Sequence, residues 1–486
     1  MTANQRTSVT IRLCIIGLML HHFGDAATAE QASPPNVVLI YTDDQGVGDV
    51  SGLNSQAKFE TPHLDRLIRE GMTFSDGHSS DSVCTPSRYG LLTGRYCWRT
   101  WLKQGVLGAD EDRPLIESDQ LTVASMLREA GYRTGMFGKW HLGMQFVGHP
   151  GNRDWTQPFR GGPIDHGFET FFGIAASMNY GVLTYLEGDR VTRPPDLWTA
   201  KKPGLVVHDQ RSYRIMPPYD ATPRPSQLGQ PLEIASDFKD VDVLERFTQR
   251  AVQFMQDHAN EAFFVYLPLT SPHKPVAPAD RFLGSSRCGA YGDFMIETDH
   301  RVGQILAALD QLKLTDRTIV IFSSDNGAEN THAGRLRHYG HQSCGMLRGC
   351  KRDLYEGGHR VPMFVRWPAE IAAGAKCDQP VCHTDVLATL ADILDIKLPT
   401  GAAPDSFSML PAWRGDAMTR EPLIHHSAKG RFAIRDGRWK LIDDESGWQL
   451  FDLQRDLGET TNVASMHPDQ VTRLSALMKD LIEQPR

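Results

Sequence analysis

Two pairs of Asx residues in this sequence each follow a run of apolar residues. Asp43 and Asp44 end the stretch NVVLIYTDD, and Asp325 and Asn326 follow the apolar run in RTIVIFSSDNG. Three carboxylates and one amide oxygen form a hard, all-oxygen ligand set, which suits Ca²⁺ or Mg²⁺ rather than zinc. Asx residues after strands are also ordinary turn formers. The matched setting of the two pairs favours a metal site.

Cys84 lies just before a predicted helix start. Thr85 is expected to cap that helix, with Pro86 in its first turn and Gly94 at its end. The free N–H groups and the dipole at a helix N-terminus favour an anion. Arg88 follows one turn later and could bind the same anion or support a group derived from Cys84. The alternative is a buried, inert cysteine.

Four other residues offer positive charge or proton transfer. Lys139 and His141 are two apart on a predicted strand, so we expect them to face the same side. This combination suits an anionic substrate, with lysine for charge and histidine for proton transfer. His273 lies in a proline-rich turn, where a structural histidine is the alternative. For Lys351, as for the Lys139 and His141 pair, the alternative is a solvated surface charge.

The elements that must position these residues indicate an α/β fold. The apolar runs before Asp43 and Asp325 are continuous, which is typical of strands buried on both faces of a sheet. Ligands gather beyond the carboxyl ends of such strands, so the two Asx pairs would meet if their strands are neighbours. We predict a large, mostly parallel or mixed sheet sandwiched by helices. Apolar spacing predicts helices at 63–71, 121–131, 244–258 and 299–312.

The chain divides into three predicted parts. Residues 1–29 resemble a cleavable export signal, with arginines, a short apolar run and a small-residue cleavage site. A membrane anchor is the alternative, but the run is short for a spanning helix and no later segment is long enough. Residues 30–398 are predicted to form a large α/β domain, and 399–486 a small α+β subdomain with an antiparallel sheet. Within the first, residues 145–232 are expected to form long loops that shape a pocket.

Composition adds two expectations. The formal net charge of −8 argues against nucleic acid as a partner, while an anionic small substrate remains possible. Of eight cysteines, one belongs to the predicted signal, and the odd remainder leaves at least one thiol unpaired. Close spacing favours disulfides between Cys344 and Cys350 and between Cys377 and Cys382, with reduced thiols as the alternative.

These motifs together resemble the type I sulfatases of the alkaline phosphatase superfamily. The stretch CTPSRYGLLTG (84–94) is similar to the first sulfatase signature, and GYRTGMFGKWH (131–141) to the second. The resemblance continues through DHGFETFFG, SPHKPVAP, SSDNGAEN and LYEGGHRVP, and so covers nearly the whole chain after residue 29. Arylsulfatase-like and galactose- or N-acetylgalactosamine-6-sulfatase-like members are more similar to this chain than the long iduronate-2-sulfatase type.

The resemblance implies that Cys84 is oxidised by a separate maturing enzyme to formylglycine (3-oxoalanine). One hydroxyl of its hydrate would attack sulfur and expel the alcohol, and proton loss from the other would release sulfate. The family pattern assigns the remaining roles by position. Ca²⁺ would be bound by Asp43, Asp44, Asp325, Asn326 and modified Cys84. Lys139 and Lys351 would neutralise the sulfate oxygens, and Ser177 would hydrogen-bond the sulfate region. Arg88 would stabilise the hydrate, His141 would assist the elimination, and His273 would be the general acid that protonates the leaving oxygen.

Two alternative functions are compatible with the sequence, and the substrate is predicted only as a class. A phosphatase or phosphodiesterase of the same superfamily would call for a second metal, and a non-catalytic sulfated-glycan binder would be expected to lack one of the catalytic residues. The substrate is expected to be a sulfated carbohydrate or aryl sulfate reached after export to the periplasm or medium. A Cys350 disulfide is hypothesised to fix the Lys351 loop. The basic residues that could line a glycan pocket, or form a solvated loop, are His332, Arg335, Arg337, His338 and His341.

Overall fold

A computed structural model describes residues 1–2, 34–109, 113–199, 215, 219, 221 and 232–484. The predicted signal peptide, apart from its first two residues, therefore lies outside the described residues. Residues Pro34–Arg486 belong to one compact unit. Within the described part of the chain, no helix is long and apolar enough to cross a membrane.

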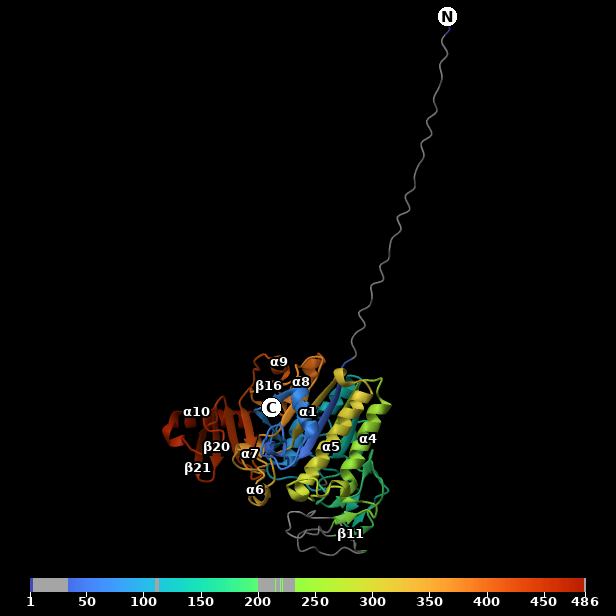
Figure 1. Cartoon of the computed structure of the whole chain (residues 1–486), viewed down its shortest axis with the longest axis horizontal. Coiled ribbons are helices and arrows are strands. Elements are labelled where there is room, and N and C mark those ends of the chain that lie inside the picture. Colours follow the sequence, from blue (N-terminus) through green and yellow to red (C-terminus); the bar gives the residue numbers. More distant parts are fainter. Residues whose placement is uncertain are drawn as a thin grey trace. The chain divides into compact units, whose positions relative to one another are not determined.

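A ten-stranded mixed sheet forms the centre of this unit (Figure 1). Its inner strands run parallel, with β1 between β13 and β14 so that Val38 lies level with Val265 and Val320. The strand order is β10-β9-β7-β4-β13-β1-β14-β15-β2-β16. The bounds are β1 (Asn36–Asp43), β2 (Met72–Phe74), β4 (Arg133–Lys139), β7 (Thr170–Ile174), β9 (Leu186–Glu187), β10 (Arg190–Val191), β13 (Phe263–Pro272), β14 (Thr318–Ser324), β15 (Met363–Arg366) and β16 (Ala375–Cys377).

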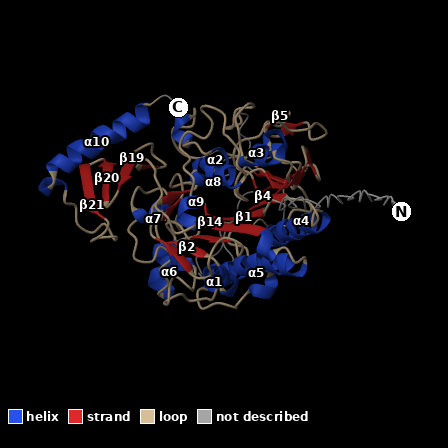
Figure 2. Cartoon of the chain, turned by 90° about the horizontal axis from the view of Figure 1, so that it is seen from above, coloured by secondary structure: helices blue, strands red, loops and turns tan. Residues whose placement is uncertain are grey.

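Helices cover both faces of the sheet, as predicted (Figure 2). One face carries α1 (Pro62–Glu70), α4 (Val243–Asp257) and α5 (Gly289–Gln311), and the other carries α2 (Cys84–Thr93), α3 (Val123–Glu129) and α8 (Asp385–Ile393). In β1, Val38 and Ile40 enter the core under the first face, whereas Leu39 and Tyr41 enter the other core. This explains the continuous apolar run, because both faces of the strand are buried. Helix α5 begins ten residues before its predicted start at 299.

The C-terminal part contains the predicted antiparallel sheet, followed by a helix at the end of the chain. Strands β18 (Leu423–His426), β19 (Phe432–Asp436), β20 (Trp439–Asp444) and β21 (Gly447–Asp452) pair in sequence order. The turn between β19 and β20 contains Gly437 at φ 55°, a left-handed conformation that glycine adopts readily. Helix α10 (Pro468–Glu483) packs Leu474, Met478 and Leu481 against this sheet.

Short elements fill the remaining described segments. Strands β8 (Val182–Leu183), β11 (Leu197–Thr199) and β12 (Leu232–Ile234) form a small sheet within the region predicted to be long loops. The other short elements are β3 (Gly77–His78), β5 (Gly148–His149), β6 (Asn152–Arg153), β17 (Val381–Cys382), α6 (His332–Tyr339), α7 (Glu356–His359), α9 (Leu410–Trp413) and 3₁₀ turns at Val47–Asp49, Cys97–Arg99, Pro163–His166, Asp240–Asp242, Asp280–Phe282, Thr315–Arg317 and Ala464–Met466.

The expected disulfides are not formed. All seven described cysteines are free thiols. Cys377 lies in β16 and Cys382 in β17, which belong to different sheets. Cys350 Sγ lies 3.7 Å from Asp353 Oδ2, to which it donates a hydrogen bond. The predicted disulfide that fixes the Lys351 loop is therefore wrong, and close spacing in the chain was a poor guide to pairing.

Candidate active site

The two predicted Asx pairs meet at the carboxyl edge of the sheet. Asp43 ends β1, and Asp325 follows β14, its parallel neighbour, in which Ser324 lies opposite Thr42. The Asp44 backbone N–H donates to Asp325 Oδ1 at 3.1 Å, and Asn326 Nδ2 donates to Asp44 Oδ1 at 2.8 Å. The parallel pairing of the strands thus brings both pairs of side chains together.

Three oxygen atoms in this group are left without partners. Asp43 Oδ1, Asp44 Oδ2 and Asn326 Oδ1 are buried and accept no hydrogen bond from any described residue. Burial, followed by the nearby Asp43 carboxylate, raises the pKa of Asp325 to about 7. Buried oxygens without donors are costly, and a cation would relieve both the missing contacts and the crowding of negative charge. The residues therefore fit a hard cation such as Ca²⁺.

Three basic side chains hold the other oxygens of these carboxylates. Lys139 Nζ donates to Asp43 Oδ2 at 2.6 Å, and Lys351 Nζ donates to Asp44 Oδ1 at 2.5 Å. Arg88 Nη2 donates to Asp325 Oδ2 at 2.8 Å. All three cations are buried. Their charge stands beside the cation site, where it can also act on a bound anion.

Cys84 is the first residue of α2 and lies next to the same acids. Val83 is the N-cap residue, whereas Thr85 Oγ1 accepts from the Leu107 N–H at 3.2 Å, so the predicted Thr85 cap is wrong. One ligand atom each from Cys84, Asp43 and Asp325 lies within 4.8 Å of the others. Burial raises the pKa of the Cys84 thiol, despite the nearby lysines. A neutral thiol is a weak nucleophile, and sulfur is a soft ligand for an oxygen-binding cation.

Arg88 lies one helical turn after Cys84 and is fully buried. Besides Asp325, its guanidinium contacts the Lys139 carbonyl oxygen at 3.3 Å and lies 5.5 Å from the centre of the Tyr41 ring. Such fixed contacts on several sides hold the arginine rigidly between the helix and the sheet. The α2 helix itself ends at Gly94 with φ 63°, as predicted.

His141 reaches the site by another route than predicted. Strand β4 ends at Lys139, and His141 takes a left-handed φ of 62° while its N–H donates to the Ala175 carbonyl. Its Nε2 lies 2.8 Å from the Leu107 carbonyl oxygen. Because a carbonyl oxygen can only accept, Nε2 carries the proton, and the buried Nδ1 has no partner among the described residues. Burial lowers the pKa of His141 well below its ordinary value, so the ring is a neutral base.

His273 follows β13 and faces Asp44. Its Nδ1 donates to the Lys274 carbonyl oxygen at 2.5 Å, and Nε2 lies 3.8 Å from Asp44 Oδ2. Burial lowers the pKa of His273 to about 4, although Asp43 and Asp44 oppose the shift. A bound anion beside Nε2 would raise that pKa and favour the protonated ring.

Ser177 is buried, and its Oγ has no partner within the described structure. It opens a turn in which the Tyr180 N–H donates to the Ser177 carbonyl at 3.0 Å. The Tyr180 ring lies 5.5 Å from His141, and Asn179 Oδ1 is a second unpartnered oxygen. Sequence reasoning missed Asn179 and Tyr180. Their position two and three residues after Ser177 was the available signal.

The basic cluster predicted as a glycan pocket is partly internal. Arg335 is buried, donates to Ser343 and lies 3.5 Å from the centre of the Tyr291 ring. His341 is buried and lies 2.7 Å from Asp49 through Nε2. The prediction of a shared polyanion pocket is therefore wrong for these two residues, because both side chains are buried and bound inside the protein.

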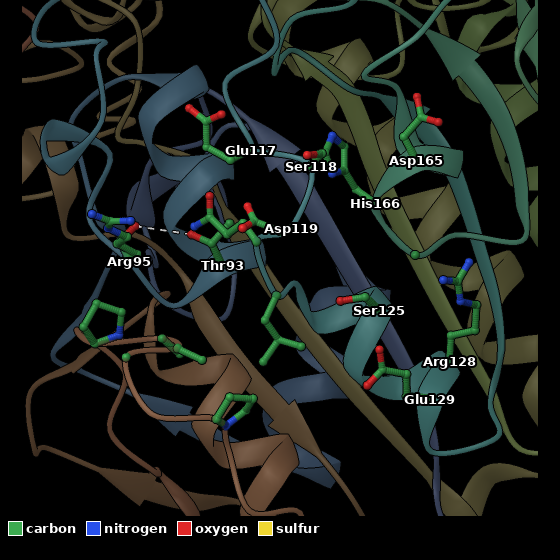
Figure 3. Close-up of a pocket in the computed structure, with 18 of the residues that line it drawn as sticks. Thr93, Arg95, Glu117, Ser118, Asp119, Ser125, Arg128, Glu129, Asp165 and His166 are labelled. Atoms are coloured by element: carbon green, nitrogen blue, oxygen red, sulfur yellow. Dashed lines mark hydrogen bonds between the residues drawn. The ribbon is translucent and has the colours of Figure 1, made fainter.

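A cavity of about 660 Å³ lies apart from the predicted site residues (Figure 3). It is lined by Thr93 at the end of α2, by Glu117 and Asp119, and by Asp165 and His166. The figure shows acidic and basic side chains around its walls. None of the predicted site residues lines this cavity, so the site depends on the buried cluster at the opposite end of α2.

A second buried group of charges, missed from the sequence, joins the α/β part to the C-terminal sheet. Lys440 Nζ in β20 donates to Glu356 Oε1 at 2.9 Å and lies 2.8 Å from Glu459 Oε1. It also lies 3.1 Å from His359 Nε2, and the His359 and His425 rings stack at 3.6 Å. We call this the interface cluster, which comprises Asp76, His78, Glu356, His359, Arg360, His425, Arg435, Lys440 and Glu459.

Known proteins resemble this chain over nearly its full described length. A family model for the sulfatases matches residues 35–396, and one for the C-terminal part of N-sulphoglucosamine sulphohydrolase matches residues 349–486. The N-acetylgalactosamine-6-O-sulfatase of Bacteroides thetaiotaomicron is 33% identical over 93% of this chain and 94% of its own length. Arylsulfatase A of Bos taurus is 34% identical over 85% of this chain and 76% of its own.

A solved structure described in terms of glycosaminoglycan metabolism by Bacteroides thetaiotaomicron has a TM-score of 0.82. It is 31% identical and covers 93% of this chain and 100% of its own. Sequence, fold and the grouped site residues point the same way. The chain therefore belongs to the sulfatase family and is a sulfuric ester hydrolase.

Proposed function

We propose that this protein hydrolyses a sulfate monoester with residue 84 in the formylglycine form and one Ca²⁺ beside it. The observation that carries the proposal is the set of buried, unpartnered oxygens next to Cys84. A cation bound by these atoms would supply positive charge beside the position proposed for the sulfate. A maturing enzyme that oxidises Cys84 is a required partner.

The cation would be held by Asp43, Asp44, Asp325 and Asn326, together with an oxygen on residue 84. When bound, it supplies a Lewis-acid charge that polarises a sulfate oxygen. An all-oxygen set with several carboxylates suits Ca²⁺ better than Mg²⁺, which keeps more of its water.

Residue 84 would supply the nucleophile only after modification. Formylglycine in its hydrated form offers a hydroxyl to attack sulfur and a second hydroxyl whose deprotonation releases sulfate. The buried thiol offers neither, because burial keeps it protonated. Arg88 is placed to hydrogen-bond the modified side chain, since it lies one turn away on the same helix.

Lys139 and Lys351 would neutralise the sulfate oxygens, and Ser177 would add a hydrogen bond. Both lysines are buried, so their charge acts in a medium of low polarisability and needs little rearrangement during the reaction. In the described structure the Ser177 hydroxyl has no partner, which leaves its proton free to be donated.

Two histidines would move protons at opposite ends of the reaction. His273 would protonate the leaving oxygen through Nε2, since Nδ1 is held by the Lys274 carbonyl. His141 would accept a proton at Nδ1, since Nε2 is held by the Leu107 carbonyl. The two carbonyl oxygens thus decide which nitrogen of each ring is available.

The substrate is proposed to be a sulfated carbohydrate. An N-acetylgalactosamine-6-O-sulfatase and arylsulfatase A are similarly identical to this chain, but the first matches 93% of the chain and 94% of its own length, against 85% and 76% for the second. The fuller match supports a sugar ester ahead of a simple aryl sulfate. The signal-like segment 1–29 supports export to the periplasm or medium, where sulfated polysaccharides are available.

Two measurements test the proposal. Mass spectrometry of the peptide containing residue 84 should show replacement of the thiol by an aldehyde. Inorganic sulfate should be released from at least one sulfated sugar, and Cys84→Ala should abolish the release, whereas Cys288→Ala, a buried thiol outside the site, should retain it. Sulfate release by protein with an unmodified thiol would contradict the proposal.

A further inference from the structure

Three charged side chains, Lys274, Glu329 and Arg352, form a rim beside the active site. Lys274 directly follows His273, and Arg352 directly follows Lys351. The side chains of Arg352 and Lys274 are 44% and 30% exposed, whereas those of His273 and Lys351 are 4% and 3% exposed. The rim therefore lies between the buried residues and solvent.

The rim has more positive than negative charge. Glu329 Oε1 accepts from Arg352 Nη1 at 2.6 Å, and Oε2 accepts from Nη2 at 3.1 Å. Lys274 Nζ donates to the same Oε2 at 3.4 Å. Two cations thus share one carboxylate, and one positive charge is left over.

Both cations retain hydrogen-bond donors. Glu329 contacts the end of the Arg352 guanidinium, and Arg352 Nε has no hydrogen-bond partner among the described residues. The edge formed by Nε and one terminal nitrogen matches two oxygens of a sulfate or carboxylate. Lys274 Nζ contacts only Glu329 in the described structure, and an ammonium has three N–H groups.

The backbone holds Arg352 in a fixed place relative to residue 84. Arg352 has φ 84°, a left-handed conformation that glycine would adopt with less strain. Its N–H donates to the Ser82 carbonyl at 2.9 Å, and the Lys351 N–H donates to the Ala328 carbonyl at 2.9 Å. The main chain of Arg352 is thus tied to the segment before Cys84, which fixes the point from which its side chain extends.

We propose that Arg352 and Lys274 form a second anion subsite, which binds a further negatively charged group of the substrate on its leaving-alcohol side. This rests on the proposed function, in which His273 protonates the leaving oxygen. Lys274 follows His273 in the chain and is more exposed, so we expect the ring that carries this oxygen to lie near the rim. The substrate class is then a carbohydrate with a second sulfate or a carboxylate near the ester that is cleaved.

Steady-state kinetics with three related substrates test the subsite. They are a monosulfated hexosamine, the same sugar with a second sulfate, and the monosulfated sugar linked to a uronic acid. Arg352→Gln should lower kcat/KM for one of the doubly charged substrates, relative to the monosulfated sugar, about tenfold, chiefly through KM. Lys274→Gln should act in the same direction with a smaller effect. Whichever doubly charged substrate responds identifies the second group as sulfate or carboxylate.

Glu329→Gln provides a change of opposite sign. It removes the carboxylate that competes with the substrate for both cations, so the preference for the doubly charged substrate should rise. Arg250→Gln is the matched control, because Arg250 has a 48% exposed side chain paired with Glu187 away from the site. It should leave the preference unchanged.

Binding measurements keep the subsite testable apart from turnover. In the Cys84→Ala background with Ca²⁺, calorimetry should show tighter binding of a doubly charged sugar, and Arg352→Gln should remove that advantage. Lack of turnover by mature protein with every sulfate ester would end the proposed function alone. Equal losses on all three sugars in both assays, or an unchanged preference in Arg352→Gln, would overturn the subsite.

Discussion

The active site and the interface cluster are both buried groups of acidic and basic side chains, but they differ in what is left unpaired. In the active site three oxygens from Asp43, Asp44 and Asn326 lack partners, and the pKa of Asp325 is raised by burial and by Asp43. Shifts in pKa do not distinguish the two groups, because Lys139 lowers the pKa of Asp43 despite its burial. In the interface cluster burial raises the pKa of Glu459, whereas Lys440 and Arg360 hold that of Glu356 well below its ordinary value.

This contrast distinguishes the active site, which can bind a cation, from the interface cluster, which holds the α/β part and the C-terminal sheet together. Unpartnered acceptors of one kind, gathered around a reactive residue, indicate a missing cation. In the interface cluster the atoms without a hydrogen-bond partner are of mixed kind, since they include both ring nitrogens of His425 and Arg435 Nη1. The charges there are balanced around Lys440, which lies between two acids and links β20 to α7. A cluster of histidines and acids there is therefore a weaker candidate for a metal, even though His78, His359 and His425 lie close together.

The largest expected effect is on catalysis. Replacement of Lys351 by methionine should lower kcat/KM for a sulfated sugar by about 10³-fold, because a buried charge aimed at the sulfate is lost. The bound cation still neutralises Asp44, so the unfolding midpoint with Ca²⁺ should change little. Comparable activity in the variant would show that this cluster is structural too.

A substitution in the interface cluster should lower stability and leave activity unchanged. Lys440→Met leaves Glu356 and Glu459 buried without their shared cation. The free energy of unfolding should therefore fall by about 3–5 kcal/mol. Turnover per folded molecule should be kept. Denaturant unfolding and active-site titration measure the two effects. Lys429→Met, which removes an exposed lysine 3.6 Å from Glu445, is the control and should be silent.

The smallest effect is a link between protons and the cation. Because the pKa of Asp325 is raised to about 7, this carboxylate holds a proton below that pH and must lose it when Ca²⁺ binds. Affinity for Ca²⁺ should thus weaken up to about tenfold per pH unit below neutrality. Calorimetry in buffers of different ionisation enthalpy should detect the released proton. Affinity that does not vary between pH 6 and 8, roughly a hundredfold range of proton activity, would argue against an oxygen site built around Asp325.

The local sequence pattern was enough to predict the central strands and the position of the acidic residues at their ends. The continuous apolar runs specified strands buried on both faces, and the parallel strands brought Asp43 and Asp44 to Asp325 and Asn326. Likewise, the sequence around Cys84 indicated a helix start, because proline and glycine have strong local preferences at helix ends. These features depend on residues near one another in the chain or on general rules of sheet topology.

Tertiary structure decided what depends on distant partners. The Leu107 carbonyl selects the tautomer of His141, and the chain beyond β4 turns that residue through a left-handed conformation. Cysteine spacing gave no pairing, since β16 and β17 lie in different sheets. The interface cluster and the rim could not be found from local pattern, because the charges that meet in each are far apart in sequence. In the sequence, each of these charged residues looks like an ordinary solvent-exposed one.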